Sequence, residues 1–150
     1  KSHKMITKIL AIAIISSFSL TACGQTKTQK SEQQTKTIQK NNKMDTTQLT
    51  NETVKKAIEA LQENDKTLWY SYFTKDAVFT DDGNKLDLKS FFDNAFNHKE
   101  KFLSIDKIEN NGKNLEGNFF AGQWGTFRTY FHFHINQEGK IERLDIGQTK

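Results

Sequence analysis

The period of the hydrophobic pattern changes once along this 150-residue chain, and that change constrains the fold more than any other feature. From Val54 to Phe96, large apolar residues recur mainly every three or four positions, as on the buried face of a helix. From Phe102 to Ile146 they tend to alternate with polar residues, as in strands that bury one face. Helices followed by consecutive antiparallel strands predict an α+β domain, with the helices packed on the concave face of a curved sheet.

Three helices are expected in the first half of this domain. The first covers residues 54–61, where the apolar positions follow i, i+3, i+4 and i+7 and Thr50 or Asn51 can cap the N-terminus. A second, shorter helix is expected over residues 68–73. A third follows Asp87, whose carboxylate can cap a helix. The third helix carries one apolar stripe, made of Leu88, Phe91, Phe92, Ala95 and Phe96.

Strand signals separated by turn residues fill the rest of the domain. A short strand at 77–80 precedes turn chemistry at 81–84, and turns rich in Gly and Asn separate the later segments. The later strands are expected at 102–108, 115–124, 126–135 and 140–146. Because 11 of the 12 phenylalanines, both tryptophans and all three tyrosines lie in this domain, its core is expected to consist largely of aromatic rings.

The charge distribution argues against nucleic acid as a partner. The whole chain has a net charge of +4, but residues 46–150 contain 14 Lys and Arg against 16 Asp and Glu, a net charge of −2. A slightly acidic domain lacks the basic face that supplies most nucleic-acid affinity through counterion release. Binding to DNA or RNA is therefore not expected.

The N-terminus has the layout of a secretory signal. Three lysines accompany a 12-residue apolar run at 9–20, which is too short to span a membrane as a stable helix. The sequence Leu20-Thr21-Ala22-Cys23 that follows resembles the bacterial lipobox, in which the cysteine is lipidated and the chain is cleaved before it. We therefore expect residues 1–22 to be a lipoprotein signal peptide and Cys23 to be the lipid anchor. The alternative is a signal peptide followed by an unmodified thiol.

Residues 23–50 are expected to be the lipid-anchored cysteine and a disordered polar linker. Large apolar residues in this stretch are limited to Ile38, Met44 and Leu49, too few to offset the entropy of ordering. The folded domain is then expected to span residues 51–150. It would be held outside the cytoplasm, on a bacterial cell membrane or outer membrane.

The domain contains, in order, Ala57-Ile58-Glu59-Ala60-Leu61, Asn64-Asp65, Tyr72-Phe73-Thr74-Lys75-Asp76-Ala77-Val78-Phe79 and Gly139-Lys140-Ile141. This layout resembles the nuclear transport factor 2-like superfamily, which includes SnoaL-like cyclases, ketosteroid isomerases and scytalone dehydratases, over about residues 51–147. The resemblance implies a cone-shaped α+β fold with a pocket between the helices and the concave sheet, often in a dimer formed through the outer sheet face. Enzymes and non-catalytic binding proteins share this fold, so individual residues must decide the function.

Asp81 is the candidate catalytic residue that the resemblance implies. In the isomerases a carboxylate just after the first strand abstracts a proton, and Asp81 lies at the matching place. In those enzymes a tyrosine and a protonated acid donate hydrogen bonds in the oxyanion hole. At the positions that the resemblance matches to them, this chain has Ala57 and Phe131, whose side chains cannot donate. Losing such a donor costs about 3 kcal/mol, which disfavours steroid-type isomerisation. The alternative for Asp81 is an ordinary turn residue.

Aromatic residues form the candidate ligand-binding site. Aromatic walls with few polar groups are typical of small-molecule pockets, although most rings in a domain of this size must pack in the core. An arginine among the candidates would hold an acidic ligand group or, as the favoured alternative, pair with an acid on a neighbouring strand. The candidates are Trp69, Tyr72, Phe92, Phe96, Trp124 and Arg128.

His132 and His134 share one face of the expected strand 126–135, opposite its apolar face. Zinc enzymes use this spacing, but zinc needs a third protein ligand, which only Asp145 or Glu142 on the neighbouring strand would supply. A solvated pair, or a pair at a homodimer interface, is favoured over a metal site. No phosphate-binding loop or redox motif occurs, so no cofactor is predicted.

Three functions remain open at this point. The first is a membrane-tethered, non-catalytic domain that binds a small apolar molecule or a partner protein. The second is a SnoaL-like, cofactor-free isomerase, lyase or cyclase that uses Asp81 as general base, with Tyr70, Tyr72 or a histidine as proton partner. The third is a structural or inhibitory accessory protein of the cell envelope. The deciding feature is whether Asp81 points into a cavity beside a second polar group or into solvent.

Overall fold

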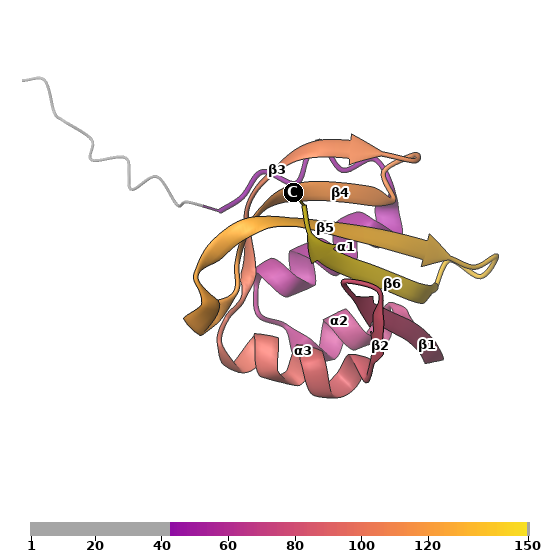
Figure 1. The fold of residues 1–150 in the computed structure, drawn as a ribbon. Coiled ribbons are helices and arrows are strands. Elements are labelled where there is room, and N and C mark those ends of the chain that lie inside the picture. The colour runs from indigo at the N-terminus through magenta and orange to yellow at the C-terminus, as the bar shows by residue number, and fades with distance from the viewer. Residues whose placement is uncertain (1–42, 150) are drawn as a thin grey trace, which may run out of the picture. The chain divides into compact units, whose positions relative to one another are not determined.

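The computed structural model describes residues 43–149 (Figure 1). The expected signal peptide, Cys23 and most of the expected linker lie outside the described residues. Within 43–149, no helix is long and apolar enough to cross a bilayer. The elements are α1 (Glu52–Gln62), α2 (Lys66–Ser71), β1 (Phe73–Asp81), β2 (Asn84–Leu86), α3 (Leu88–Asn97), β3 (Lys101–Glu109), β4 (Asn114–Phe120), the 3-10 helix η1 (Gly122–Trp124), β5 (Thr126–Ile135) and β6 (Ile141–Gln148).

Each α-helix begins where the sequence supplies a cap. The side chains of Asn51, Asp65 and Asp87 each accept a hydrogen bond from the backbone N–H three residues later, at 2.7–3.1 Å. The first and third helices were expected close to these positions. The second is shorter than expected, because it ends at Ser71 and Phe73 already belongs to β1.

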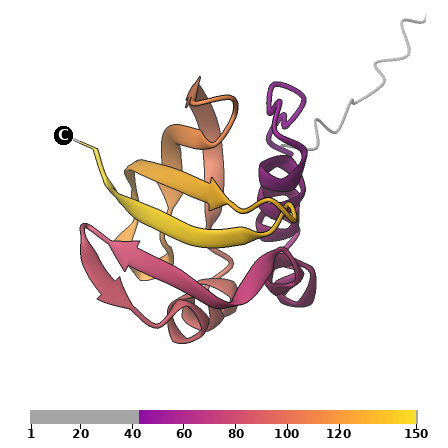
Figure 2. The same ribbon diagram turned by 90° about the vertical axis from the view of Figure 1, so that its right-hand side faces the viewer.

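Six strands form one curved, open sheet in the order β2-β1-β6-β5-β4-β3, with the helices packed on one face (Figures 1 and 2). β3 to β6 follow one another as antiparallel neighbours, as expected. β1 lies parallel to β6, so the last strand of the domain occupies the middle of the sheet. The expected α+β class is confirmed, and the three-residue strand β2 is an addition to it.

The core between helices and sheet is built mainly from rings, as the composition predicted. Trp69 is fully buried, with ring centroids 5.0 Å from Phe73 and 4.7 Å from Phe92. On the sheet side, the centroids of Phe102 and Phe131 lie 4.9 Å apart. Burying a large apolar side chain contributes about 1.5–3 kcal/mol, so these contacts supply much of the stability that holds the sheet in its curved form.

Gly117 brings β3 and β4 unusually close together. A Cβ atom at Gly117 would lie 1.9 Å from the backbone oxygen of Ser104 and 2.8 Å from the Cα atom of Ile105. The register of β3 against β4 shifts between Ile105 and Lys107 at the same place. An irregularity of this kind bends a strand, so the glycine contributes to the curvature that makes room under the sheet.

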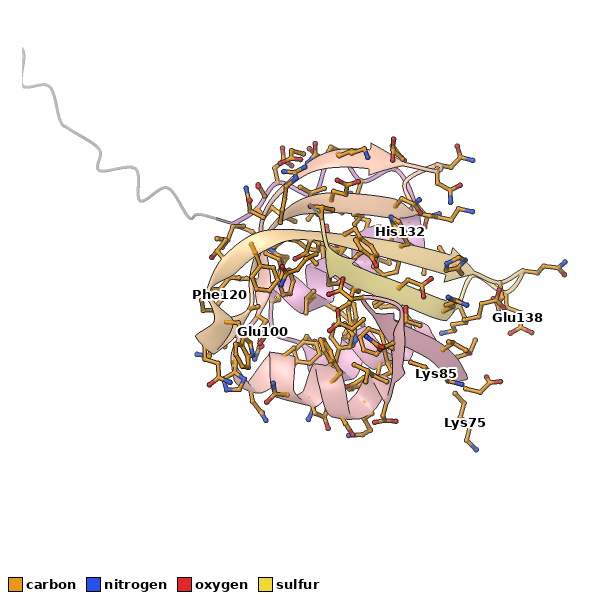
Figure 3. The ribbon with its side chains drawn as sticks, in the orientation of Figure 1. Lys75, Lys85, Glu100, Phe120, His132 and Glu138 are labelled. Atoms are coloured by element: carbon orange, nitrogen blue, oxygen red, sulfur yellow. The ribbon has the colours of Figure 1, made fainter. Side chains whose placement is uncertain are left out.

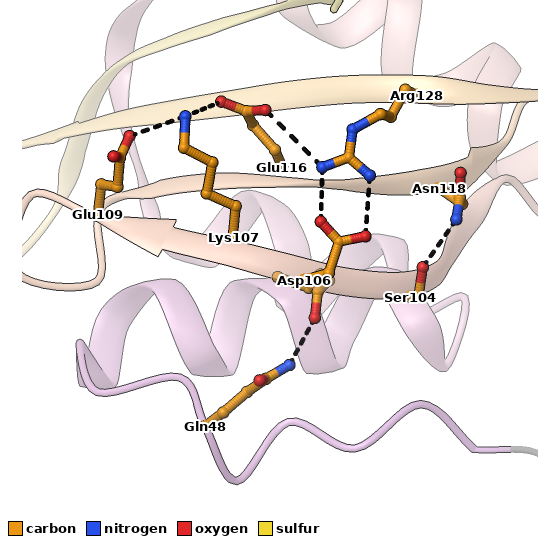
Figure 4. Close-up of polar contacts among 9 residues, drawn as sticks. Gln48, Ser104, Asp106, Lys107, Glu109, Glu116, Asn118 and Arg128 are labelled. Atoms are coloured by element: carbon orange, nitrogen blue, oxygen red, sulfur yellow. Dashed lines mark hydrogen bonds and ion pairs between the residues drawn. The ribbon is translucent and has the colours of Figure 1, made fainter.

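Residues 43–50 pack against the domain, although the sequence assigned them to the linker. Leu49 is 4% exposed and belongs to the core. The Thr46 hydroxyl donates a hydrogen bond of 2.7 Å to Glu59. The Gln48 side-chain amide donates one of 2.7 Å to the backbone oxygen of Ile105 (Figure 4). The polar composition hid this contact because one buried leucine and two specific hydrogen bonds are enough to hold a short segment. The folded part of the chain therefore includes these residues.

Candidate ligand-binding site

A cavity of about 180 Å³ lies between α3 and the concave face of the sheet. The strands contribute to it because alternate residues of β4, β5 and β6 face the helices. α3 contributes through the side that faces the sheet. The apolar lining consists of Phe91, Phe92, Ala95, Phe119, Ala121, Trp124, Phe127, Phe131 and Ile146.

Asp81 lies at the end of β1 and lines this cavity. Of the two positions considered from the sequence, a cavity or solvent, Asp81 therefore borders the cavity. Its neighbour on β6 is Ile146, which also lines the cavity. The side chain is half-buried, and its burial, followed by the nearby carboxylate of Asp82, raises the pKa of Asp81 above its ordinary value. In the described part of the chain, no hydrogen bond reaches this carboxylate to oppose the shift.

Glu100 and Thr129 are further polar side chains in the lining. Glu100 is 8% exposed and precedes β3 at the end of the molecule that carries Phe120 (Figure 3). Burial raises the pKa of Glu100. The Thr129 hydroxyl is shielded from solvent and has no hydrogen-bond partner among residues 43–149. An unpaired buried hydroxyl costs about 1–3 kcal/mol, so this group favours a partner inside the cavity.

Trp124 lies at the rim of the cavity. It follows β4 in η1, lines the cavity and is 74% exposed. Gly122, the first residue of η1, has φ +56°, and a Cβ atom there would lie 2.8 Å from the Cβ atom of His98. This tight turn holds Trp124 at the rim of the cavity.

The structure divides the five aromatic residues among the sequence-predicted ligand residues into three groups. Phe92 and Trp124 line the cavity. Trp69 and Phe96 are buried in the core and are not part of the lining. Tyr72 is half-buried at the C-terminal cap of α2, also outside the lining. All of these aromatic residues have similar local sequence patterns, so the sequence did not separate rings that border the cavity from rings that fill the core.

Arg128 lies on the outer face of the sheet and does not reach the cavity. Its guanidinium group makes a two-point ion pair with Asp106, with Nη1 donating at 2.9 Å to Oδ2, across the intervening strand β4 (Figure 4). This guanidinium holds the pKa of Asp106 below its ordinary value. The ion pair was the favoured alternative for Arg128. Lys107 and Glu116 form a second pair on the same face, at 2.7 Å.

His132 and His134 also lie on the outer face, as alternation predicted. His134 is exposed, and its Nε2 atom lies 2.9 Å from Oδ2 of Asp145. His132 is half-buried (Figure 3). Its ring packs against that of Tyr130 in a tilted arrangement, with ring centroids 4.7 Å apart. Within residues 43–149, no three His, Cys, Asp or Glu side chains are arranged to hold a metal ion.

Sequence reasoning missed several polar cavity residues, among them the buried Glu100 and Thr129. The position of Thr129 could have been predicted, because alternation along 126–135 placed it on the apolar face with Phe127 and Phe131. No sequence pattern indicates that Glu100 is buried, since an acid between a helix and a strand usually faces solvent. Its burial depends on the turn at Gly122, where a Cβ atom would lie 3.2 Å from Oε1 of Glu100.

Comparison with known proteins supports the fold. No protein-family model and no curated protein matches the chain. A nuclear transport factor 2-like protein of unknown function from Cytophaga hutchinsonii is 16% identical, with coverage of 67% of this chain and 89% of that chain and a TM-score of 0.55. A cystatin-fold protein from Novosphingobium aromaticivorans is 19% identical, with coverage of 65% and 96% and a TM-score of 0.54. A putative ketosteroid isomerase from Kribbella flavida is 8% identical, with coverage of 68% and 78% and a TM-score of 0.52.

Similarity at these identities concerns the fold alone. It agrees with the curved, unclosed sheet and with the helices packed on it. The chain therefore has the nuclear transport factor 2-like, cystatin-like α+β fold that the sequence resemblance implied.

Proposed function

We propose that the domain binds a small apolar molecule in the cavity between α3 and the sheet, as a binding protein rather than an enzyme. The observation that carries this proposal is the cavity of about 180 Å³, whose apolar lining consists largely of phenylalanines, with Trp124 at its rim. An apolar cavity of about 150 Å³ is enough to take up benzene. The volume therefore suits a molecule with one ring and a short side chain.

The polar groups of the lining support binding better than proton abstraction. A general base needs a partner that stabilises the developing negative charge or returns a proton. Tyr70 lies outside the lining, and its single hydroxyl proton is directed between the backbone oxygen of Lys89 and Oδ1 of Asp93, each 3.0 Å from the hydroxyl oxygen. Tyr72 and the β5 histidines also lie outside the lining. A second carboxyl group, Glu100, would repel an enolate when ionised.

A specific observation favours one second candidate, a cofactor-free isomerase, lyase or cyclase with Asp81 as base. Asp81 lines the cavity, and burial raises its pKa toward the range that suits a base. For catalysis, Glu100 would have to be protonated and act as the proton donor. Exchange of the α-hydrogens of phenylacetone in deuterated water, followed by NMR, tests this candidate. Exchange that Asp81→Asn abolishes would favour an enzyme, and exchange at the rate without protein would favour a binding protein.

Uptake of 2-phenylethanol, a neutral probe of suitable size, tests the binding proposal. Titration calorimetry is expected to show one site per chain. Ala95 is buried on α3 and lines the cavity, so Ala95→Leu should fill part of the space and abolish uptake. Ala77→Leu adds the same atoms on β1 outside this cavity and should leave uptake unchanged. Equal affinities of both variants and the unmodified chain would contradict the proposed site.

The proposal also includes attachment to a membrane through a lipid on Cys23, at the outer face of a bacterial cell membrane or at the outer membrane. Its support is the motif Leu20-Thr21-Ala22-Cys23 behind an apolar run. Cys23→Ser should move the protein from the membrane fraction to the soluble fraction or leave it uncleaved. Fractionation followed by immunoblotting measures this. Unchanged membrane association of the processed protein would refute the anchor.

A further inference from the structure

We infer that the cavity selects a small cationic amine with an apolar, preferably aromatic, body. This inference rests on the proposed binding function and specifies the chemical class of the ligand. Three independent features of the lining support it: carboxyl groups without partners, a buried hydroxyl without a partner, and a wall of aromatic rings.

The first feature is a pair of carboxyl groups with no compensating charge. Asp81 and Glu100 both line the cavity, and no hydrogen bond or ion pair from residues 43–149 reaches either carboxylate. Asp82, also in the lining, differs because its Oδ1 atom accepts a hydrogen bond from the backbone N–H of Gln148 at 3.0 Å. The lining contains no Lys, Arg or His among the described residues. A buried negative charge without a partner is costly, and an ammonium group would remove that cost, whereas a carboxylate ligand would increase it.

The basic side chain of His98 does not remove this imbalance. It lowers the pKa of Glu100 by less than burial raises it, and it is exposed at the C-terminal cap of α3, outside the lining. Its Nδ1 atom lies 3.0 Å from the backbone oxygen of Asn94, to which it donates. Burial remains the main influence on Glu100 and raises the pKa of its carboxyl group.

The second feature is the Thr129 hydroxyl, which does not depend on the acids. Thr129 is 4% exposed, lines the cavity, and its oxygen has no partner within residues 43–149. It lies on β5, which stands in the sheet between β1, the strand that ends at Asp81, and β3, the strand that Glu100 precedes. A hydroxyl oxygen accepts a hydrogen bond from an ammonium group readily. An amine in the cavity would therefore satisfy a group that the protein leaves unpaired.

The third feature is the chemistry of the walls. Phe91, Phe119 and Phe127 line the cavity, and Trp124 adds an indole at the rim. Ring faces carry partial negative charge and attract cations, Trp most strongly. The same rings accommodate the apolar body of the ligand. An aromatic amine thus matches both the acids and the walls.

Three isosteric probes test the inference on the full chain: 2-phenylethylamine, 2-phenylethanol and phenylacetate. Calorimetry near neutral pH should show the amine binding about tenfold or more tighter than the alcohol, as expected for a charge-assisted hydrogen bond in a shielded site. Phenylacetate should bind more weakly than the alcohol. Fluorescence of Trp124 provides a second signal, and Trp124→Phe identifies its contribution.

Two charge-neutralising variants locate the effect. At least one of Glu100→Gln and Asp81→Asn should lower amine affinity about tenfold and leave alcohol affinity unchanged. Thermal unfolding checks that each variant is folded. Glu142→Gln is the matched control, because Glu142 is an exposed residue of β6 outside the cavity lining. It removes the same charge and should leave the preference unchanged.

The results separate this inference from the proposed function. If the alcohol binds as tightly as the amine, or if neither cavity variant reduces the preference, the amine inference is overturned while the binding function stands. If none of the three probes binds, the binding function itself fails. A preference that Glu142→Gln removes equally would show a general charge effect and also overturn the inference.

Discussion

Two partly buried aspartates on neighbouring strands have pKa values shifted in opposite directions, because only one of their carboxylates accepts hydrogen bonds from residues 43–149. Burial by itself would raise the pKa of Asp145, but hydrogen bonds from Thr80, Arg143 and His134 hold that pKa below its ordinary value. Asp81 lies on the opposite face and has no such donors, so burial raises its pKa. The outer face thus neutralises its charges internally, whereas the cavity does not. This difference is the basis of the selectivity that we propose for the cavity.

At the same scale, His132 should make the stability of the domain depend on pH. Burial lowers the pKa of His132, and Asp145 and Glu116 only partly oppose this effect. The unfolded chain therefore takes up a proton before the folded one, and stability should fall as the pH drops below about 6.5. Above that pH, this residue contributes no slope. Urea unfolding at a series of pH values from about 8 to about 5 measures the effect.

His132→Gln removes the titrating group and should reduce the loss of stability over that range. His98→Gln, at an exposed position on the C-terminal cap of α3, is the matched control and should leave the slope as it is. The explanation fails if the His132 variant and the unmodified chain lose stability in parallel.

At the scale of elements, the sequence predicted correctly the helices and strands whose sequence signals lie within one short stretch of chain. α1 and α3 combine a capping side chain with an apolar stripe, and both features lie within one stretch of chain. The predicted end of the second helix was wrong, because Phe73 continues the helical spacing of apolar residues but pairs with Ile141 in the sheet. β2 was missed because all three of its residues are exposed and carry no hydrophobic pattern. Contacts between distant segments decided both cases.

The candidate site was predictable to a similar extent. Alternation gives the direction of Asp81, because Phe79 lies two residues earlier on the same strand and is buried in the core. Phe92 and Trp124 were found, but the sequence equally favoured Trp69, which fills the core. Which rings leave a cavity between them depends on the curvature of the sheet. That curvature follows from close approaches such as the one at Gly117, and ring spacing in the sequence does not encode it.

The segment 43–50 should contribute measurably to stability. Leu49→Ala would remove a side chain that is 4% exposed within the core, at an expected cost of about 2–5 kcal/mol in the free energy of unfolding. A chain starting at Thr46 keeps this leucine, whereas one starting at Asn51 loses it. Denaturant unfolding measures both changes.

The control for this prediction is Leu103→Ala. Leu103 lies on β3 and is 51% exposed, so its truncation should change stability by less than about 0.5 kcal/mol. If the two alanine variants unfold at the same denaturant concentration, the segment does not stabilise the domain as its packing indicates.

For the whole molecule, we propose a homodimer formed through the outer face of the sheet. This face presents Tyr130, His132 and His134 on β5. A two-fold contact here would bring the histidines of both copies close together. Protonation would then place like charges against each other, so the dimer should weaken as the pH falls from about 8 to about 5.

Sedimentation velocity at several protein concentrations measures the association across this range. The double variant His132→Gln, His134→Gln should remove the dependence on pH while the domain stays folded. A protein that sediments as a monomer at every pH would refute the dimer. A dimer whose affinity ignores both pH and the substitutions would place the interface elsewhere.

The central position of β6 has a consequence for how the chain acquires its structure during synthesis. β1 and β2 are made early, but their connection to the other strands is β6, which ends at Gln148. Until a ribosome has released that strand, the N-terminal hairpin has no neighbour in the sheet, and the apolar sides of α1 and α3 lack their full cover. Folding must therefore wait for contacts between distant parts of the chain, which makes it slow and leaves the nascent domain open to chaperones and proteases.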